Sequence, residues 1–164
     1  MTSSDLQQLY QQIILDHAKA RHGFSAEPFA DLAETPAGPD GSRVAESHQV
    51  NTSCGDEVTV RVSVPSATAD RIEELVWRGE GCSISMASAS VLSDAVRDIP
   101  ADEARALLAA FREMLRSRGA IEPDEETMGD AAAFAGVSRY PARVKCAMLP
   151  WVAFEEALLH LEAR

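Results

Sequence analysis

The amino-acid sequence predicts an α+β protein, in which a three-stranded antiparallel meander lies between helical segments. Hydrophobic and polar residues alternate between residues 44 and 78, as expected for strands that are buried on one face. Before and after that stretch, hydrophobic residues recur at spacings of three and four, which is typical of helices with one buried face. The chain has 164 residues, of which 46% are hydrophobic. We therefore expect a single domain over residues 1–164 with a core of its own.

The first predicted helix spans Asp5 to His17. Its hydrophobic face consists of Leu6, Leu9, Tyr10, Ile13, Ile14 and His17. Because His17 lies in this apolar stripe, we expect a hydrogen-bonded core histidine rather than a metal ligand. Residues 21–42 are rich in Pro, Gly and Asp, which indicates a loop that crosses the surface.

The strand pattern is clearest in the segment EVTVRVSV, from Glu57 to Val64. Four valines alternate there with polar or charged residues, so one face of the strand is hydrophobic and the other is polar. Weaker alternation predicts partner strands at 44–50 and 72–78, with a turn at 65–70. Connections this short cannot contain parallel crossovers, so the three strands are expected to be antiparallel.

Further helices are predicted after the strands. The first begins near Cys82 and carries a hydrophobic stripe as far as Ile99, with Ser85, Ser88 and Ser93 mostly on the other side. Pro100 opens the next helix, which is expected to end at Gly119. A short acidic helix is predicted at 125–134 and a last helix at 142–163, in which Pro150 either introduces a kink or marks the true first turn.

The charge of the chain excludes some classes of partner. Acidic residues outnumber basic residues by 26 to 15, which gives a formal net charge of −11. Such a protein repels polyanions and anionic membrane surfaces, so neither nucleic acid nor a membrane is an expected partner. The first residues lack the regions of a signal peptide, and no stretch approaches the roughly 18 apolar residues of a membrane span. We expect a cytoplasmic protein whose three cysteines are reduced.

The three cysteines are the candidate functional residues. Cys54 lies in the polar segment NTSCGDEV before the valine strand, Cys82 lies where the third strand gives way to a helix, and Cys146 lies near the start of the last helix. Backbone N–H groups and the helix dipole at such places favour a thiolate. Asp56 follows two residues after Cys54, and Gly55 allows the bend that would bring both side chains into one cavity.

Three thiolates and one carboxylate could form a tetrahedral ligand set for Zn²⁺, namely Cys54, Asp56, Cys82 and Cys146. Their negative charge would exceed the charge of the ion. Residues 131–154 contain no acidic side chain, and they supply a compensating cationic patch that consists of Arg139, Arg143 and Lys145. The sequence contains no C-x-x-C pair, however, and each cysteine taken singly is about as well explained as a small buried side chain.

Four segments of the chain resemble the SufU family, the sulfur-transfer relatives of the IscU-type iron–sulfur scaffold proteins. They are LYQQIILDH in the first helix, CGDEV at the first cysteine, GEGCSISMASAS at the second and GVSRYPARVKCAML at the third. The resemblance implies an α+β fold whose antiparallel sheet packs against helices, and a Zn²⁺ ion bound by Cys54, Asp56, Cys82 and Cys146. It also implies a partner, a cysteine desulfurase of the SufS type.

Two features favour the sulfur-transfer branch over the scaffold branch. Lys145 stands where scaffold proteins generally have a histidine, and an added helical segment occupies about residues 100–120. Pro150 departs from the family pattern and puts the path of the chain after Cys146 in question.

The function that follows is zinc-dependent sulfur transfer. Cys54 would accept persulfide sulfur from the desulfurase, Arg143 would stabilise the developing anionic sulfur, and the sulfur would pass to downstream iron–sulfur assembly scaffold proteins. The first alternative is an IscU-type scaffold, on which the same four residues hold a transient iron–sulfur cluster. The second is a structural zinc domain that binds a partner without chemistry.

Overall fold

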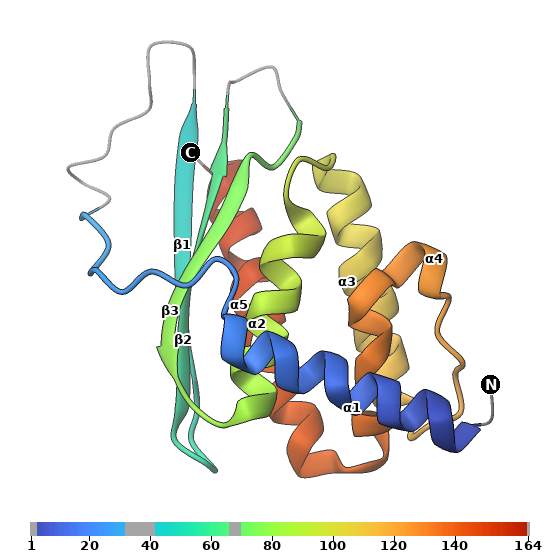
Figure 1. Ribbon diagram of the computed structural model, residues 1–164. Coiled ribbons are helices and arrows are strands. Elements are labelled where there is room, and N and C mark those ends of the chain that lie inside the picture. Colours follow the sequence, from blue (N-terminus) through green and yellow to red (C-terminus); the bar gives the residue numbers. More distant parts are fainter. Residues whose placement is uncertain (1–2, 32–41, 66–69, 164) are drawn as a thin grey trace.

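The computed structural model describes residues 3–31, 42–65 and 70–163 and confirms the predicted α+β class (Figure 1). Its elements are α1 (Ser3–Ala20), β1 (Arg43–Asn51), β2 (Asp56–Val64), β3 (Glu74–Glu80), α2 (Ser83–Val96), α3 (Ala101–Arg116), α4 (Glu125–Met128), the 3₁₀ helix η2 (Gly129–Arg139) and α5 (Pro141–Ala163). The residues at which an added helical segment is expected form α3. Among the described residues, no helix is both long and apolar enough to cross a membrane.

The three strands form one antiparallel sheet in the order β1-β2-β3. Asn51 pairs with Asp56 at the tight connection between β1 and β2, and Glu57 pairs with Glu80 at the end of β3. This register brings the first turn of the meander and the exit from β3 to the same end of the sheet. The predicted turn at 65–70 includes residues 66–69, which lie outside the described part of the chain.

Helices cover one face of the sheet, as Figure 1 shows. The four alternating valines of β2 are all buried on that face, where α5 packs against β1 and β2 and α2 packs against β3. Burial of each valine side chain contributes about 1.5–3 kcal/mol. On the outer face the loop after α1 crosses β2, since Arg61 donates to the carbonyl of Ala30 at 2.5 Å and lies over the ring of Phe29.

Helix α2 is the centre of the helical layer, and its serines differ from expectation. Ser85, Ser88 and Ser93 are buried, although the sequence pattern places them on the side away from the hydrophobic stripe. The Ser88 hydroxyl donates to the carbonyl of Ala147 at 2.5 Å, and the Ser93 hydroxyl donates to the carbonyl of Leu75 at 2.7 Å. Small side chains let neighbouring elements approach this helix closely, and their hydroxyls find partners there.

Several predicted boundaries and exposures are corrected by tertiary contacts. Leu9 was expected on the buried face of α1 but is 45% exposed. The third strand begins at Glu74 rather than at residue 72, and the helix expected at 125–134 is divided into α4 and η2 at Gly129, whose φ is +55°. Pro150 lies inside α5 rather than at its first turn.

Candidate metal centre

Three segments that are distant in sequence meet at one end of the sheet, and each contributes one predicted cysteine ligand. Cys54 lies in the turn between β1 and β2, where the Gly55 amide donates to the carbonyl of Asn51 at 2.8 Å and Gly55 has φ +79°. Cys82 occupies the N-cap position of α2, and its carbonyl accepts from the Met86 amide. Cys146 lies in the second turn of α5.

Cys54, Asp56 and Cys146 form a compact group, in which one ligand atom from each lies within 4.8 Å of the others. Asp56 and Cys146 are only 5% and 8% exposed, whereas Cys54 is exposed. The sulfur of Cys82 is not part of this three-residue group. It lies beside the group, because the Cys82 amide donates to Asp56 Oδ1 at 3.2 Å and the Cys82 thiol interacts with both Asp56 and Cys146.

Asp56 is held as a carboxylate. Burial acts to raise its pKa, but hydrogen bonds from Ser85, Cys82 and Cys54 outweigh burial and leave the pKa below its usual value. The shortest of these bonds runs from the Ser85 hydroxyl to Asp56 Oδ2 at 2.5 Å. Sequence reasoning did not assign Ser85 to the site. Its position three residues after Cys82, in the first turn of a helix, was the available signal.

Cys146 differs from the expectation that its position near a helix start favours a thiolate. Burial raises its pKa to about 12, and the neighbouring thiols of Cys82 and Cys54 act in the same direction. The Cys146 thiol donates to the carbonyl of Ala142 at 3.6 Å, one turn earlier in α5. Since the side chain lies in the second helical turn and is buried, desolvation outweighs the helix dipole.

This donor set fits Zn²⁺. Three thiols and one carboxylate match the soft and hard ligands of tetrahedral zinc sites. A cation at the centre of these four side chains would also offset the repulsion between neighbouring thiolates that opposes ionisation of Cys146.

Arg143 lies in α5 one helical turn before Cys146, and its side chain is exposed. Its guanidinium carbon is 5.0 Å from the centroid of the Tyr140 ring. Arg143 and Arg139 line a cavity of about 520 Å³ that also reaches Ser83, the residue after Cys82. Lys145 is exposed, so the predicted cationic patch flanks the thiols rather than entering their cluster.

Gly81 explains how Asp56 can lie directly against the β3–α2 junction. A Cβ atom on Gly81 would lie 2.7 Å from Cγ of Asp56, which is closer than atoms can pack. We expect Gly81→Ala to displace the carboxylate and to lower zinc affinity at least tenfold, the lower end of the effect of disturbing a ligand's surroundings. Chelator competition measures this change. Gly136→Ala is the matched control, because nothing lies within 4 Å of a Cβ atom there, and equal losses in both variants would refute the explanation.

Comparison with known proteins places these segments in a described family. The family model "NifU-like N terminal domain" matches residues 9–147. The chain is 34% identical over 158 residues to the "Iron-sulfur cluster assembly scaffold protein IscU" of Streptococcus pyogenes serotype M1, which covers 96% of this chain and 87% of that protein. It is 32% identical over 156 residues to the "Zinc-dependent sulfurtransferase SufU" of Bacillus subtilis, which covers 95% and 93% of the two chains.

A solved structure agrees with these sequence relatives. The putative iron–sulfur cluster assembly scaffold protein for the SUF system from Fervidobacterium islandicum AW-1 superimposes with a TM-score of 0.67 at 30% identity, covering 90% of this chain and 94% of that chain. The predicted kinship with SufU and with the wider group of IscU-like and NifU-like proteins is therefore confirmed.

Proposed function

Since the chain belongs to the family of NifU-like N-terminal domains, we propose that it serves iron–sulfur cluster assembly as a zinc-dependent sulfur acceptor. In this function it takes persulfide sulfur from a cysteine desulfurase of the SufS type and passes it to a downstream assembly scaffold protein. The observation that carries the proposal is the convergence of Cys54, Asp56 and Cys146 at one end of the sheet, with Cys54 exposed. The similarity of this chain to a relative named a zinc-dependent sulfurtransferase also supports sulfur transfer as its function.

Cys54, Asp56, Cys82 and Cys146 are the proposed zinc ligands. Bound Zn²⁺ would keep their thiols deprotonated at neutral pH. The Ser85 hydroxyl and the Cys82 amide orient Asp56 within this set, since each holds a different carboxylate oxygen. Such hydrogen bonds to ligands contribute to metal affinity.

Cys54 is the proposed sulfur acceptor. It is exposed and lies on a turn next to Gly55, where an added Cβ atom would meet nothing within 4 Å. Cys82 is exposed as well, but it occupies the N-cap position of α2, and Cys146 is buried inside α5, so the backbone of both residues is fixed by a helix. Cys54 can therefore move toward a donor with the least rearrangement.

The transfer is a thiol–disulfide type exchange at sulfur. The Cys54 thiolate attacks the terminal sulfur of the donor's cysteine persulfide, and a new S–S bond forms on Cys54 as the S–S bond of the donor breaks. The donor cysteine leaves as a thiolate, so no external oxidant or reductant is needed. Arg143, one turn before Cys146, is the proposed cation that stabilises the anionic sulfur.

Desulfurase turnover tests this proposal. The unaltered chain is expected to stimulate cysteine desulfurase turnover, whereas Cys54→Ser removes the acceptor sulfur and is expected to abolish that stimulation. Circular dichroism checks that the variant stays folded. Ser53→Ala is the matched control, because Ser53 is an exposed neighbour in the same turn, and it should stimulate fully. Undiminished stimulation by Cys54→Ser would exclude Cys54 as the acceptor.

A scaffold function is the second candidate, and the Streptococcus relative named as a scaffold protein favours it. The two functions differ in what the chain carries. Anaerobic reconstitution with iron and sulfide would give a scaffold a visible absorption band and the ability to activate an apo-protein. For the sulfur acceptor we expect neither. Lys145, in place of the histidine that scaffold proteins generally carry, supports sulfur transfer.

A further inference from the structure

The geometry points to a second metal site, at which His17, His22 and Asp94 bind one divalent transition-metal ion at the protein surface. This site is separate from the thiol cluster. Asp94 lies in the last turn of α2, whereas Cys82 caps the first turn of the same helix. The rise along an α-helix places these positions roughly 18 Å apart.

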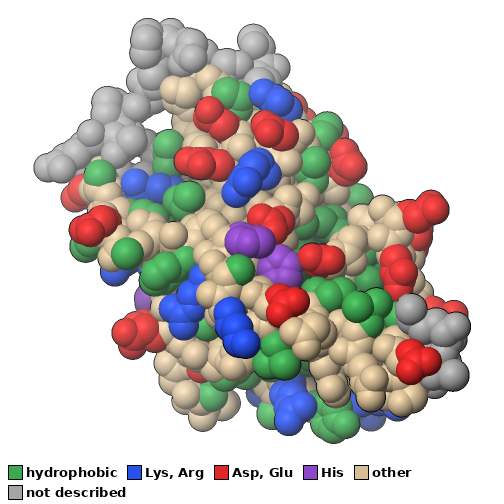
Figure 2. Space-filling view, in the orientation of Figure 1, with side chains coloured by type: hydrophobic (Ala, Val, Ile, Leu, Met, Phe, Trp, Pro, Cys, Tyr) green, Lys and Arg blue, Asp and Glu red, His purple; other side chains and the backbone are tan. Residues whose placement is uncertain are grey.

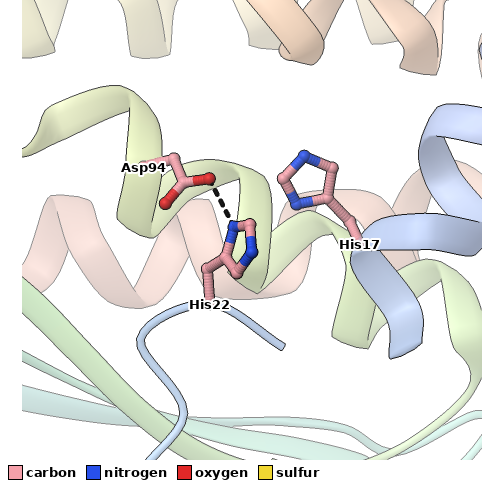
Figure 3. Close-up of side chains that lie close together, drawn as sticks. All are labelled: His17, His22 and Asp94. Carbon is pink, nitrogen blue, oxygen red and sulfur yellow. Dashed lines mark hydrogen bonds and ion pairs between the residues drawn. The ribbon is translucent and has the colours of Figure 1, made fainter. Parts of the chain in front are cut away.

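The three side chains converge on one point. One ligand atom from each lies within 4.8 Å of the others. His22 Nδ1 is 2.6 Å from Asp94 Oδ2, and the centroids of the two imidazole rings are 5.2 Å apart. Figure 3 shows the His22 ring between Asp94 and His17, with a ring nitrogen of His17 turned toward it.

The backbone holds His22 in this position before any ion binds. Its amide donates to Ser90 Oγ at 2.9 Å, and its carbonyl accepts from Trp77 Nε1 at 2.8 Å. The flanking residues Arg21 and Gly23 have φ values of +48° and +79°, which reverse the chain after α1 and direct His22 back toward His17. A preorganised ligand loses less conformational freedom when it binds.

His17 is the buried, hydrogen-bonded histidine that the sequence predicts, but its surroundings also match those of a metal-bound histidine, a role that the sequence pattern does not assign to it. Its Nε2 is 2.8 Å from Asp130 Oδ2, and its ring is only 6% exposed. A carboxylate that holds one ring nitrogen fixes the orientation of the imidazole and leaves the other nitrogen for an ion. His17 Nδ1 now shares a hydrogen bond of 2.8 Å with Ser90 Oγ. Ion binding would replace that single bond, while Ser90 keeps the His22 amide as a donor.

Two imidazoles and one carboxylate suit borderline divalent ions such as Zn²⁺, Ni²⁺, Co²⁺ and Fe²⁺ rather than Mg²⁺ or Ca²⁺. The net charge of −11 attracts cations in general. The side chains of His22 and Asp94 are 48% and 41% exposed. Figure 2 shows histidine side chains at the surface of this face with acidic side chains beside them, so an ion can enter from solvent and keep water at its remaining positions.

Cobalt titration of the full chain, with its thiol site already filled by Zn²⁺, tests the second site. We expect one further Co²⁺ to bind per chain, with weak visible bands and without the intense near-ultraviolet absorption of cobalt bonded to thiolate. The absence of a further bound ion would overturn the proposal, and so would a further ion that shows thiolate absorption.

Variants identify the ligands. His22→Gln and Asp94→Asn should each weaken Co²⁺ binding by more than tenfold, and Asp130→Asn should weaken it about tenfold through loss of the orienting carboxylate. His48→Gln is the matched control, because His48 is also exposed and lies 3.6 Å from a carboxylate, that of Glu57. Unchanged binding in both His22→Gln and Asp94→Asn, or equal weakening in His48→Gln, would exclude the site. Zinc retained at the thiol centre confirms that each variant is folded.

Discussion

Replacing Cys146 with serine is expected to lower zinc affinity by more than the roughly 100-fold that the loss of an outer hydrogen-bond partner can cost. The serine hydroxyl can donate to the carbonyl of Ala142 as the Cys146 thiol does, so the helix is expected to remain intact. What is lost is one anionic sulfur from the proposed ligand set, since a serine hydroxyl stays protonated at neutral pH.

The pKa of Cys146 gives this variant a second signature. Burial and the neighbouring thiols raise that pKa to about 12, so the metal-free thiol is protonated at neutral pH. Zinc uptake must displace its proton, and zinc affinity should therefore rise with pH below that value. Cys146→Ser should release one proton fewer per bound ion.

Chelator competition measures the affinity, and an indicator dye in weak buffer measures the proton release. Val152→Ala is the control, because Val152 is an exposed side chain on the same helix and belongs neither to the proposed ligands nor to the cationic patch. If Cys146→Ser and the unaltered chain bind zinc equally well and release the same number of protons, Cys146 is not a ligand.

Trp151→Ala is expected to lower the free energy of unfolding by about 3–5 kcal/mol, the range for truncation of a large aromatic core residue. Trp151 is fully buried and stacks on Phe111 with their ring centroids 4.2 Å apart, which joins α5 to α3. Its Nε1 also donates to Ser88 Oγ at 3.0 Å, and Ser88 in turn holds the carbonyl of Ala147 beside Cys146. The substitution therefore leaves a cavity and removes a buried hydrogen bond.

Urea denaturation of the reduced, metal-free chain measures the effect without a contribution from metal binding. Leu159→Ala on the same helix is the control, because Leu159 is 59% exposed and should change stability by no more than about 0.5 kcal/mol. A loss for Trp151→Ala as small as that of the control would contradict the assigned core.

The sheet could be predicted because its pattern is local. The valines of β2 alternate within eight residues, from Glu57 to Val64, and the structure buries all four. The start of β3 could not be placed in the same way. The Ile72 amide donates to the carbonyl of Ile99, and Arg71 forms an isolated β-bridge with Pro100. The backbone at Ile72 therefore pairs with the segment between α2 and α3 rather than with β2.

The helical layer was harder to predict where burial involves polar residues. The serines of α2 resemble an exposed face in sequence, and only the tertiary packing provides carbonyl partners for their hydroxyls. The hydrophobic stripe of α1 likewise does not reveal that Leu9 is left partly uncovered.

In the candidate site, too, some residues could be predicted from the sequence and others depend on tertiary contacts. Few residue types bind metals strongly, so the three cysteines and Asp56 could be singled out from the sequence and from family resemblance. Ser85 could not, because its role depends on a contact with Asp56 across the fold. The pairing of His22 with Asp94 joins residues 72 positions apart, and no spacing in the sequence indicates it.

Mass spectrometry of the chain after incubation with a cysteine desulfurase and free cysteine tests the proposed function most directly. Peptide mapping under non-reducing conditions should locate one added sulfur atom on the peptide that contains Cys54 and none on the peptides of Cys82 and Cys146. Added sulfur on either of those peptides instead, or on none of the three, would contradict the proposal that the exposed thiol of the β1–β2 turn receives the sulfur.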